Sequence, residues 1–292
     1  MKYLITGVSG QLGYDVKRDL LERGVSENDI SSPRTAEMDI TDRQAVENYV
    51  ENFRPDVIIH CAAYTNVDGA ESDPEVCQKV NVEGTKHLVE AAKQVNAKLI
   101  YISTDYVFNG ESSEPYEVES QADPQSVYGA TKYEGELAVQ SYFKHFIVRI
   151  SWVFGINGHN FVKTMIKVSK GREVVSVVDD QIGSPTYTVD LAKFLIDLSK
   201  SDKYGTYHAT NEGFCSWADF TEEIYRLAGI TTKVNHVSTD EYIKIAGRPQ
   251  AKRPHYSKLS KKVLEENGFT RLPSWQDATR RYIAELEKEG EI

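Results

Sequence analysis

A tyrosine and a lysine four residues apart are the side chains in this sequence that could most directly perform chemistry together. Tyr128 and Lys132 form a Tyr-x-x-x-Lys motif within residues 128–142, whose pattern predicts a helix. Residues four apart share one face of a helix, so the phenol and the ammonium can point into one site. A free phenol has a pKa of ~10 and is a reluctant acid near neutral pH. We expect Lys132 to lower the pKa of Tyr128 and bring it nearer the range for general acid–base catalysis.

The motif alone is weak evidence, because a Tyr-x-x-x-Lys pair is more often part of an exposed helix face, but its context strengthens it. Thr104 follows residues 99–103, which read as a buried strand. Ligands of open α/β sheets bind outside the carboxyl ends of the strands. We therefore expect Thr104 to hydrogen-bond and orient a carbonyl oxygen to which Tyr128 gives a proton, and the next residue, Asp105, to help fix the substrate.

A glycine-rich turn lies near the N-terminus. The sequence GVSGQLG follows a predicted strand at residues 3–6 and opens a predicted helix at residues 11–23. Glycines in this position permit a tight turn and close approach of the backbone to a pyrophosphate, which then sits on the N-terminal amides of the helix. The turn therefore favours a dinucleotide site. Its expected cofactor-binding residues are Gly7, Gly10, Gln11, Leu12 and Gly13.

The identity of the dinucleotide depends on the residues after the second strand, which we expect near residues 29–32. An acid there would bond the ribose hydroxyls of NAD, whereas an arginine would favour the 2′-phosphate of NADP. The chain has Arg34 and no acid until Glu37. We therefore expect NADPH, with Arg34 as the 2′-phosphate contact; NADH stays possible, and the alternative is that Arg34 is a solvated loop residue. Residues expected along the rest of the cofactor groove are Asp39 and Ile40 beside the adenine, then Ala62, Ala63 and Tyr64.

Strands and helices alternate through the first half of the chain, and the strands are continuously apolar. Strands are expected at residues 3–6, 57–61, 99–103 and 146–150, and helices at 11–23, 42–53, 75–95 and 128–142. This pattern indicates an α/β fold with a parallel sheet covered on both faces, the doubly wound, Rossmann-like fold.

The second half of the chain is less regular. Helices are expected at residues 160–169, 189–199, 216–227, 258–267 and 275–288, and a strand at 174–178. We predict a dinucleotide-binding domain at residues 1–153 and a smaller α/β substrate-binding lobe at residues 154–292, interleaved so that the boundary is approximate.

Composition restricts the partners of the protein. The 292 residues carry a formal net charge of −10, which argues against nucleic acid or an anionic membrane as a partner. No apolar run reaches the ~18 residues of a membrane span, and the N-terminus lacks the pattern of a signal peptide. The three cysteines form neither a disulfide framework nor a CxxC motif, and the seven histidines show no metal-binding spacing. We expect a cytoplasmic protein without a metal site. The oligomeric state stays open: the protein could be a monomer or a homodimer, with or without Mg²⁺ at the interface.

These motifs, in this order, resemble the extended short-chain dehydrogenase/reductase superfamily and, within it, the dTDP-4-dehydrorhamnose reductases. The matching segments cover nearly the whole chain: GVSGQLG (7–13), MDIT (38–41), RPDVIIH (54–60), CAAYTNVDGAE (61–71), STDYVF (103–108), YGATK (128–132), RISWVFG (149–155), NFVKTM (160–165), DQIGSPT (180–186) and KRP (252–254). STDYVF, SWVFG and DQxGxPT are far more specific than the glycine turn. Arg34 is a departure, because many relatives have an acid there.

The resemblance implies an oxidoreductase that reduces the C4 ketone of dTDP-4-dehydro-L-rhamnose with NAD(P)H to give dTDP-L-rhamnose. It implies that Tyr128 is the general acid for the C4 oxygen and that Lys132 tunes Tyr128 and holds the nicotinamide ribose. Thr104 would orient the carbonyl. The resemblance also places Trp152 in the substrate site and lets Val67 and Asp68 reach the sugar.

A thymidine-diphosphate sugar needs cationic groups for its phosphates. Residues 244–262 contain no acid and seven basic residues: Lys244, Arg248, Lys252, Arg253, Lys258, Lys261 and Lys262. Arg253 is the best diphosphate candidate, because a guanidinium fork matches phosphate oxygens in pairs, whereas most of the others are expected to be solvated. Asn160 and Gln181 are further polar candidates for the substrate.

Two alternatives stay open. A nucleotide-sugar reductase, epimerase or dehydratase of the same superfamily is one, although a dehydratase needs a carboxylic acid, typically a Glu in the strand-end motif, where this chain has Tyr106 after Asp105. The other is a non-catalytic NADP-binding subunit, like the regulatory β subunit of methionine adenosyltransferase, which resembles this family. The intact set of Thr104, Tyr128 and Lys132 argues against that role.

The cofactor preference can be tested at Arg34. We predict that Arg34→Ala raises KM for NADPH about 10-fold, the effect of losing one charge-assisted hydrogen bond, and leaves KM for NADH nearly unchanged. Steady-state kinetics with both cofactors, before and after the substitution, measure this ratio. A ratio that does not move would show that Arg34 is only a solvated loop residue.

Overall fold

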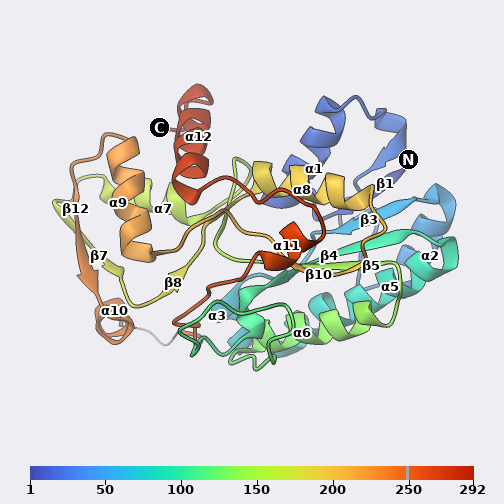
Figure 1. The fold of residues 1–292 in the computed structure, drawn as a ribbon, viewed down its shortest axis with the longest axis horizontal. Coiled ribbons are helices and arrows are strands. Elements are labelled where there is room, and N and C mark those ends of the chain that lie inside the picture. The colour runs from blue at the N-terminus through green and yellow to red at the C-terminus, as the bar shows by residue number, and fades with distance from the viewer. Residues whose placement is uncertain (248–249) are drawn as a thin grey trace.

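Six parallel strands form the central sheet of the computed structural model, which describes residues 1–247 and 250–292 (Figure 1). The strand order is β10-β5-β4-β3-β1-β2. The strands are β1 (Tyr3–Thr6), β2 (Ile30–Ser31), β3 (Val57–His60), β4 (Lys98–Thr104), β5 (His145–Ile150) and β10 (Gly205–His208). The order reverses between β1 and β3, so their carboxyl ends flank the switch point at which such sheets bind ligands. The doubly wound parallel fold is confirmed.

Helices cover both faces of the sheet because successive strand residues point to opposite sides and both sides are apolar. Ile5 and Ile59 face a core with α1 (Gln11–Glu22) and α8 (Thr188–Ser199). Leu4 and Ile58 face a second core. That core is covered by α2 (Arg43–Phe53), α5 (Gly84–Val95) and α6 (Val127–Gln140). Figure 1 shows α1 and α8 on one side of the sheet and α2, α5 and α6 on the other.

A smaller lobe lies beside the sheet, at the left of Figure 1, around its own aromatic core. Its main elements are α7 (Phe161–Ser169), β7 (Val174–Val178), α9 (Trp217–Leu227), β12 (Lys233–Val237), α10 (Thr239–Ala246) and α12 (Trp275–Lys288). Its core includes Phe154, Phe220 and Tyr282. Between α7 and α9 the chain returns to the large sheet to form α8 and β10. The boundary at residue 153 stays a prediction.

Short elements complete the described chain. They are η1 (Glu27–Asp29), α3 (Val67–Ser72), η3 (Asp105–Val107), β6 (Val153–Phe154), β8 (Ile182–Gly183), β9 (Thr186–Tyr187), β11 (Cys215–Ser216) and α11 (Lys262–Glu266). None of the described helices has the length and apolar character needed to cross a membrane.

The long helix expected at residues 75–95 is present, but it is not α-helical throughout. It consists of α4 (Pro74–Gln78), a π-helical turn (Lys79–Glu83) and then α5. The turn carries Asn81, whose side chain accepts a hydrogen bond from the Tyr64 amide at 2.8 Å and donates one to the Tyr64 carbonyl at 3.1 Å. The extra residue in the turn thus lets the helix hold the loop after β3, and π-turns are frequent at functional sites.

The helix expected at residues 258–267 begins later than predicted. Residues 258–260 are extended beside Tyr116: its amide donates to the Lys258 carbonyl, and the Ser260 amide donates to the Tyr116 carbonyl. Only after this pairing does the chain turn into α11 (Lys262–Glu266). The partner segment lies far away in the sequence, so the local apolar pattern could not reveal it.

A buried ion pair fastens α6 to the sheet. Glu136 on α6 is fully buried and receives Arg149 of β5 through two bonds, Nε–Oε1 at 2.9 Å and Nη2–Oε2 at 2.7 Å. Ser103 of β4, which pairs in register with Arg149, also donates to Glu136. The pair therefore connects one helix with two neighbouring strands.

Breaking this pair should be costly. We predict that Glu136→Gln lowers the free energy of unfolding by about 3–5 kcal/mol, because it leaves the Arg149 charge buried without a counter-charge. Urea unfolding followed by circular dichroism measures the change. Glu134→Gln on the exposed face of the same helix is the matched control and should change stability by about 0.5 kcal/mol or less; equal effects of the two variants would contradict the prediction.

Candidate active site

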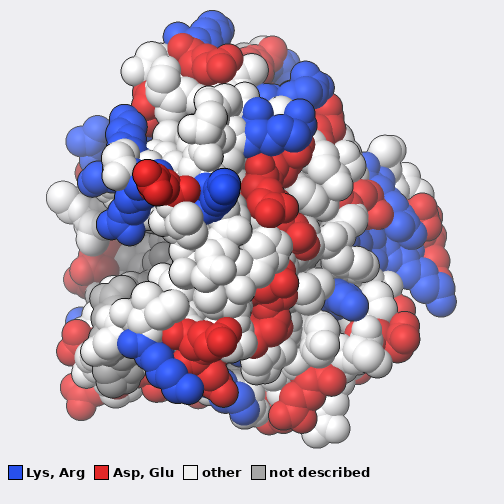
Figure 2. All heavy atoms as spheres, turned by 90° about the vertical axis from the view of Figure 1, so that its left-hand side faces the viewer, with Lys and Arg blue, Asp and Glu red and all other residues white. Residues whose placement is uncertain are grey.

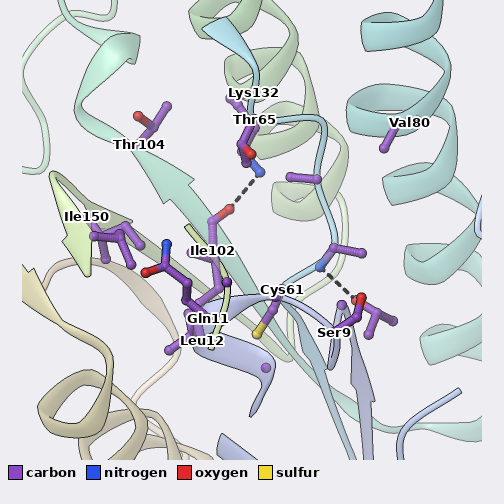
Figure 3. Close-up of a pocket in the computed structure, with 18 of the residues that line it drawn as sticks. Ser9, Gln11, Leu12, Cys61, Thr65, Val80, Ile102, Thr104, Lys132 and Ile150 are labelled. Atoms are coloured by element: carbon purple, nitrogen blue, oxygen red, sulfur yellow. Dashed lines mark hydrogen bonds between the residues drawn. The ribbon is translucent and has the colours of Figure 1, made fainter. Parts of the chain in front are cut away.

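A cleft of about 750 Å³ opens at the carboxyl ends of the sheet strands. Its walls come from the glycine turn, the segments after β2 and β3, the ends of β4 and β5, α6 and the start of α9. Figure 3 shows Gln11 and Leu12, Cys61, Thr104 and Ile150 arranged around this space. The cleft thus lies at the switch point of the sheet and extends toward the smaller lobe.

The glycine turn is packed so closely that side chains would not fit. Gly7 has a φ of +71°, and a Cβ there would lie 2.7 Å from the Ala62 amide nitrogen. A Cβ on Gly13 would lie 2.5 Å from the Gly7 carbonyl oxygen. The N-cap of α1 is Gly10, which offers no side chain to the first-turn amides. These amides and the close backbone approach suit a phosphate-bearing ligand.

The adenosine end of the cleft contains the residues expected there. Arg34 lines the cleft and is exposed, and in the described part of the chain its guanidinium forms no ion pair. Asp39 also lines the cleft and accepts hydrogen bonds from the amide and hydroxyl of Thr41 at 2.9 and 2.8 Å. These bonds hold the pKa of Asp39 below its usual value. Its carboxylate therefore shapes the turn that brings Ile40 to the cleft wall.

The segment after β3 contributes small side chains to the groove. Ala62 and Ala63 line the cleft, and the Ala62 amide donates to the Thr6 hydroxyl at 3.1 Å. Tyr64 is not among the lining residues; its backbone is held by Asn81, as described above.

Thr104, Tyr128 and Lys132 meet on one wall of the cleft. Thr104 ends β4, where its hydroxyl donates to Asp105 at 3.0 Å and accepts from the Tyr106 amide at 3.2 Å. Tyr128 and Lys132 lie in the first two turns of α6. The Lys132 ammonium is buried and donates to the Ile102 carbonyl at 2.7 Å; this is the dashed line beside Ile102 in Figure 3.

The pKa of Tyr128 is not lowered as the spacing with Lys132 predicted. Burial is the largest influence on Tyr128 and raises the pKa of its phenol above the ordinary value, against the opposing effect of the Thr104 side chain. Burial also lowers the pKa of Lys132 to about 7, against the opposing charge of Glu136. Tyr128 is therefore a protonated phenol near neutral pH, the form that can donate a proton to an oxygen.

Asp105 is a buried acid beside these groups. Its Oδ1 accepts from Thr104, and its Oδ2 has no hydrogen-bond partner in the described residues. Burial raises the pKa of Asp105 to about 6. Because the residue lines the cleft, its carboxyl can accept a hydrogen bond from a ligand hydroxyl.

Two residues expected to bind the substrate are paired with each other. The Arg253 guanidinium meets the Asp68 carboxylate through Nη1–Oδ1 at 3.1 Å and Nη2–Oδ2 at 3.3 Å. Neither lines the cleft, but Val67, the neighbour of Asp68 on α3, does. The pair connects α3 with the segment that follows α10.

Trp152 and two aromatic residues that sequence reasoning missed also line the cleft. Tyr106 packs edge-on against Tyr128, with ring centroids 5.4 Å apart, and Trp217 stacks on Trp152. Tyr106 lies inside the STDYVF segment and could have been found there. Trp217 carried no comparable signal.

Asn160 and Gln181 do not line the cleft. Asn160 is buried and caps α7, and its amide donates to Gln11, to the Gly155 carbonyl and to Tyr282. Gln181 donates to the Thr239 hydroxyl at 3.0 Å.

The basic residues of the segment 244–262 lie in several different environments. Lys252 donates to Gln125, Lys262 pairs with Glu266, and Lys261 is buried near the ring of Phe214. Arg248 lies outside the described residues. The described part of the chain contains no cluster of acidic, histidine or cysteine side chains that could hold a metal ion.

The chain is similar to proteins of known family. The family model described as the RmlD substrate binding domain matches residues 1–288. The dTDP-4-dehydrorhamnose reductase of Escherichia coli is 37% identical over 98% of each chain, and the spore coat polysaccharide biosynthesis protein SpsK of Bacillus subtilis is 37% identical over 97% of each.

Solved structures are also similar. The dTDP-4-dehydrorhamnose reductase of Bacillus anthracis in complex with NADP has a TM-score of 0.92 and 43% identity, covering 98% of this chain and 100% of that one. The Clostridium acetobutylicum enzyme of the same name gives 0.93 and 42%, with the same coverage. A Thermus thermophilus UDP-glucose 4-epimerase, at 23% identity and a TM-score of 0.81, shares the fold.

The burial of Lys132 predicts a pH dependence of stability. Below about pH 7 the lysine is protonated in both the folded and the unfolded chain, whereas between pH 7 and about 10 only the unfolded chain holds the proton. The contribution of Lys132 to the free energy of unfolding should therefore rise with pH across this window, by up to ~1.4 kcal/mol per pH unit.

Urea unfolding at pH 7, 8 and 9 tests this. We expect Lys132→Met to be most stabilised relative to the wild type at pH 7 and to lose that advantage as the pH rises. Lys86→Met, at an exposed lysine, should follow the wild type at every pH. Parallel curves for the wild type and Lys132→Met would contradict the assignment.

Proposed function

The chain belongs to the dTDP-4-dehydrorhamnose reductase family, and from this premise we propose that it reduces the C4 ketone of dTDP-4-dehydro-L-rhamnose with NADPH to give dTDP-L-rhamnose. One observation supports this most strongly. Thr104, Tyr128 and Lys132, from β4 and α6, meet on the wall of the same cleft that begins at the glycine turn. A dinucleotide bound at the turn would thus extend toward a proton donor.

The residues around the turn fit a dinucleotide cofactor, which supplies a hydride when bound. The N-terminal amides of α1 would hold the pyrophosphate, and Arg34 would meet the 2′-phosphate of NADPH. Because Arg34 is exposed, its contact adds attraction without being required for binding, so NADH stays possible. Ala62 and Ala63 leave room for the cofactor to lie against the ends of the strands.

Tyr128 provides the proton in this proposal. Its partly buried phenol is protonated near neutral pH, so it can give the proton to the C4 oxygen as the hydride arrives at C4. Thr104 orients the same oxygen with its hydroxyl. Lys132, fixed on the Ile102 carbonyl, would hold the nicotinamide ribose and, once that ligand approaches, favour the phenolate that remains after proton transfer.

The substrate would be held by residues of both lobes. Arg253 would bind the diphosphate, exchanging part of its contact with Asp68 for phosphate oxygens. Asp105 would accept a sugar hydroxyl, and Val67 and Trp152 would contact the sugar. Asn160 and Gln181 would act through the residues that they hold, Gln11 and Thr239.

A second substrate has a specific observation in its favour. A relative from Streptomyces niveus, 36% identical over 95% of this chain, is named dTDP-4-keto-6-deoxy-D-glucose reductase. That sugar differs in configuration, but it presents the same ketone to the same three side chains. We therefore keep this diastereomer as the alternative substrate.

We further propose that the enzyme acts in the cytoplasm as a monomer or homodimer.

We predict that the purified protein oxidises NADPH only when dTDP-4-dehydro-L-rhamnose is present. Tyr128→Phe should lower kcat by ~10²-fold or more, because acid catalysis is typically worth 10²–10⁴-fold. The same variant should still bind NADPH, since the phenylalanine keeps the ring in place. Absorbance at the NADPH band measures turnover, and fluorescence titration measures cofactor binding.

Phe143→Ala, at an exposed aromatic residue outside the cleft, is the control and should turn over like the wild type. Near-wild-type turnover by Tyr128→Phe would remove Tyr128 from its role. NADPH binding without substrate-dependent oxidation by the wild type would instead favour a non-catalytic, NADP-binding subunit.

A further inference from the structure

Two tryptophans stack face to face in the cleft. The ring centroids of Trp152 and Trp217 are 3.6 Å apart, and the ring planes differ by 12°. Both residues line the cleft. Trp152 follows β5 and Trp217 begins α9, so the stack joins the large sheet to the smaller lobe. The proposed reaction gives no role to Trp217.

Trp152 is held in a conformation that a side chain rarely adopts. Its φ of +49° lies in the left-handed region, where non-glycine residues are uncommon and persist only when the surroundings determine them. The Thr186 amide donates to its carbonyl at 3.0 Å. A Cβ on Gly183 would lie 2.7 Å from the indole, so the ring needs a glycine beside it. The surroundings therefore fix this indole closely.

Trp217 is fixed from the opposite side. The Ser216 hydroxyl accepts a hydrogen bond from the Asp219 amide, and the Asp219 carboxylate accepts one from the Ser216 amide, which forms a capping box at the start of α9. The ring of Phe161 lies 4.4 Å from the Trp217 ring, centroid to centroid. Trp217 thus lies between Phe161 and Trp152 and supports the Trp152 ring as a rigid apolar surface.

This surface lies next to the reacting end of the cleft. Thr104 pairs in register with Ile150, and Trp152 is only two residues further along the chain. Asp105, Tyr128 and Ser151 offer polar atoms near this end, whereas Ile150 and the two indoles offer apolar surface, of which the indoles are the largest. In a 6-deoxy-4-keto sugar the methyl carbon C6 is two bonds from the carbonyl carbon, so it must lie close to the same wall.

We propose that the Trp152–Trp217 stack recognises the C6 methyl group of a 6-deoxy-4-keto sugar and that Trp217 is a specificity-determining residue. The inference rests on the proposed reductase function and specifies which part of the sugar the site recognises. A hydrophobic pocket typically distinguishes one carbon group by about 10- to 200-fold. Trp217 contributes by holding the indole surface in place.

Two probes isolate the methyl group: dTDP-4-keto-6-deoxyhexose and the dTDP-4-ketopentose that lacks C6. We expect kcat/KM of the wild type to favour the hexose at least ~10-fold. Trp217→Ala and Trp217→Leu should lower this preference at least ~5-fold, mainly through a higher KM for the hexose, with little change for the pentose. Trp275→Phe, at a buried tryptophan of the same lobe that does not line the cleft, should keep the preference.

Each outcome decides the proposal. A wild-type preference near one, an unchanged preference in a folded Trp217 variant, or equal losses on both probes would overturn it, and thermal unfolding identifies folded variants. If neither Trp217 variant folds, the wild-type preference decides. A wild type that consumes NADPH with neither probe, nor with dTDP-4-dehydro-L-rhamnose, contradicts the proposed function instead.

Discussion

The burial of one face of α6 against β4 and β5 is the constraint on which the site depends. Tyr128, Lys132 and Glu136 follow at intervals of four residues, so they lie along one stripe of the helix. Glu136 is bound by Arg149 of β5 and by Ser103 of β4. A buried pair contributes little net stability but is costly to break. Any rotation of α6 would unpair these charges, so the pair fixes the stripe and thereby places Tyr128 beside Thr104.

The same burial decides the protonation of the site. In water an ammonium near a phenol would favour the phenolate, and the spacing of Tyr128 and Lys132 suggested that effect. In the folded chain desolvation is the largest influence on both groups, raising the pKa of the phenol and lowering that of the ammonium. The lysine moreover gives its hydrogen bond to the Ile102 carbonyl. In the proposed reaction a partly buried proton donor would thus act with a lysine on the same helix face, whose charge would favour the phenolate once a ligand is bound.

The parts of the structure that could be predicted from sequence are those determined locally. Apolar strands, helix faces and the glycine turn each depend on neighbouring residues; Gly13, for example, is required by its close approach to the Gly7 carbonyl within the turn. The features that could not be predicted depend on distant partners. The π-turn follows from Asn81 reaching back to Tyr64, and the late start of α11 follows from pairing with Tyr116. Trp217 enters the cleft only because the smaller lobe packs against the end of β5.

The net charge of the chain likewise does not show where its charged side chains lie or what they contact. The chain carries a net charge of −10, and on the face formed by the smaller lobe acidic and basic side chains lie next to one another (Figure 2). The basic side chains of residues 244–262 likewise make separate contacts, since Arg253 pairs with Asp68 and Lys262 pairs with Glu266. In the proposed complex a diphosphate would therefore not meet a preformed cationic patch among the described residues. It would compete with Asp68 for Arg253, so that binding would exchange one ion pair for another, and selectivity would come from the fit of the sugar between Thr104, Tyr128 and the indole stack.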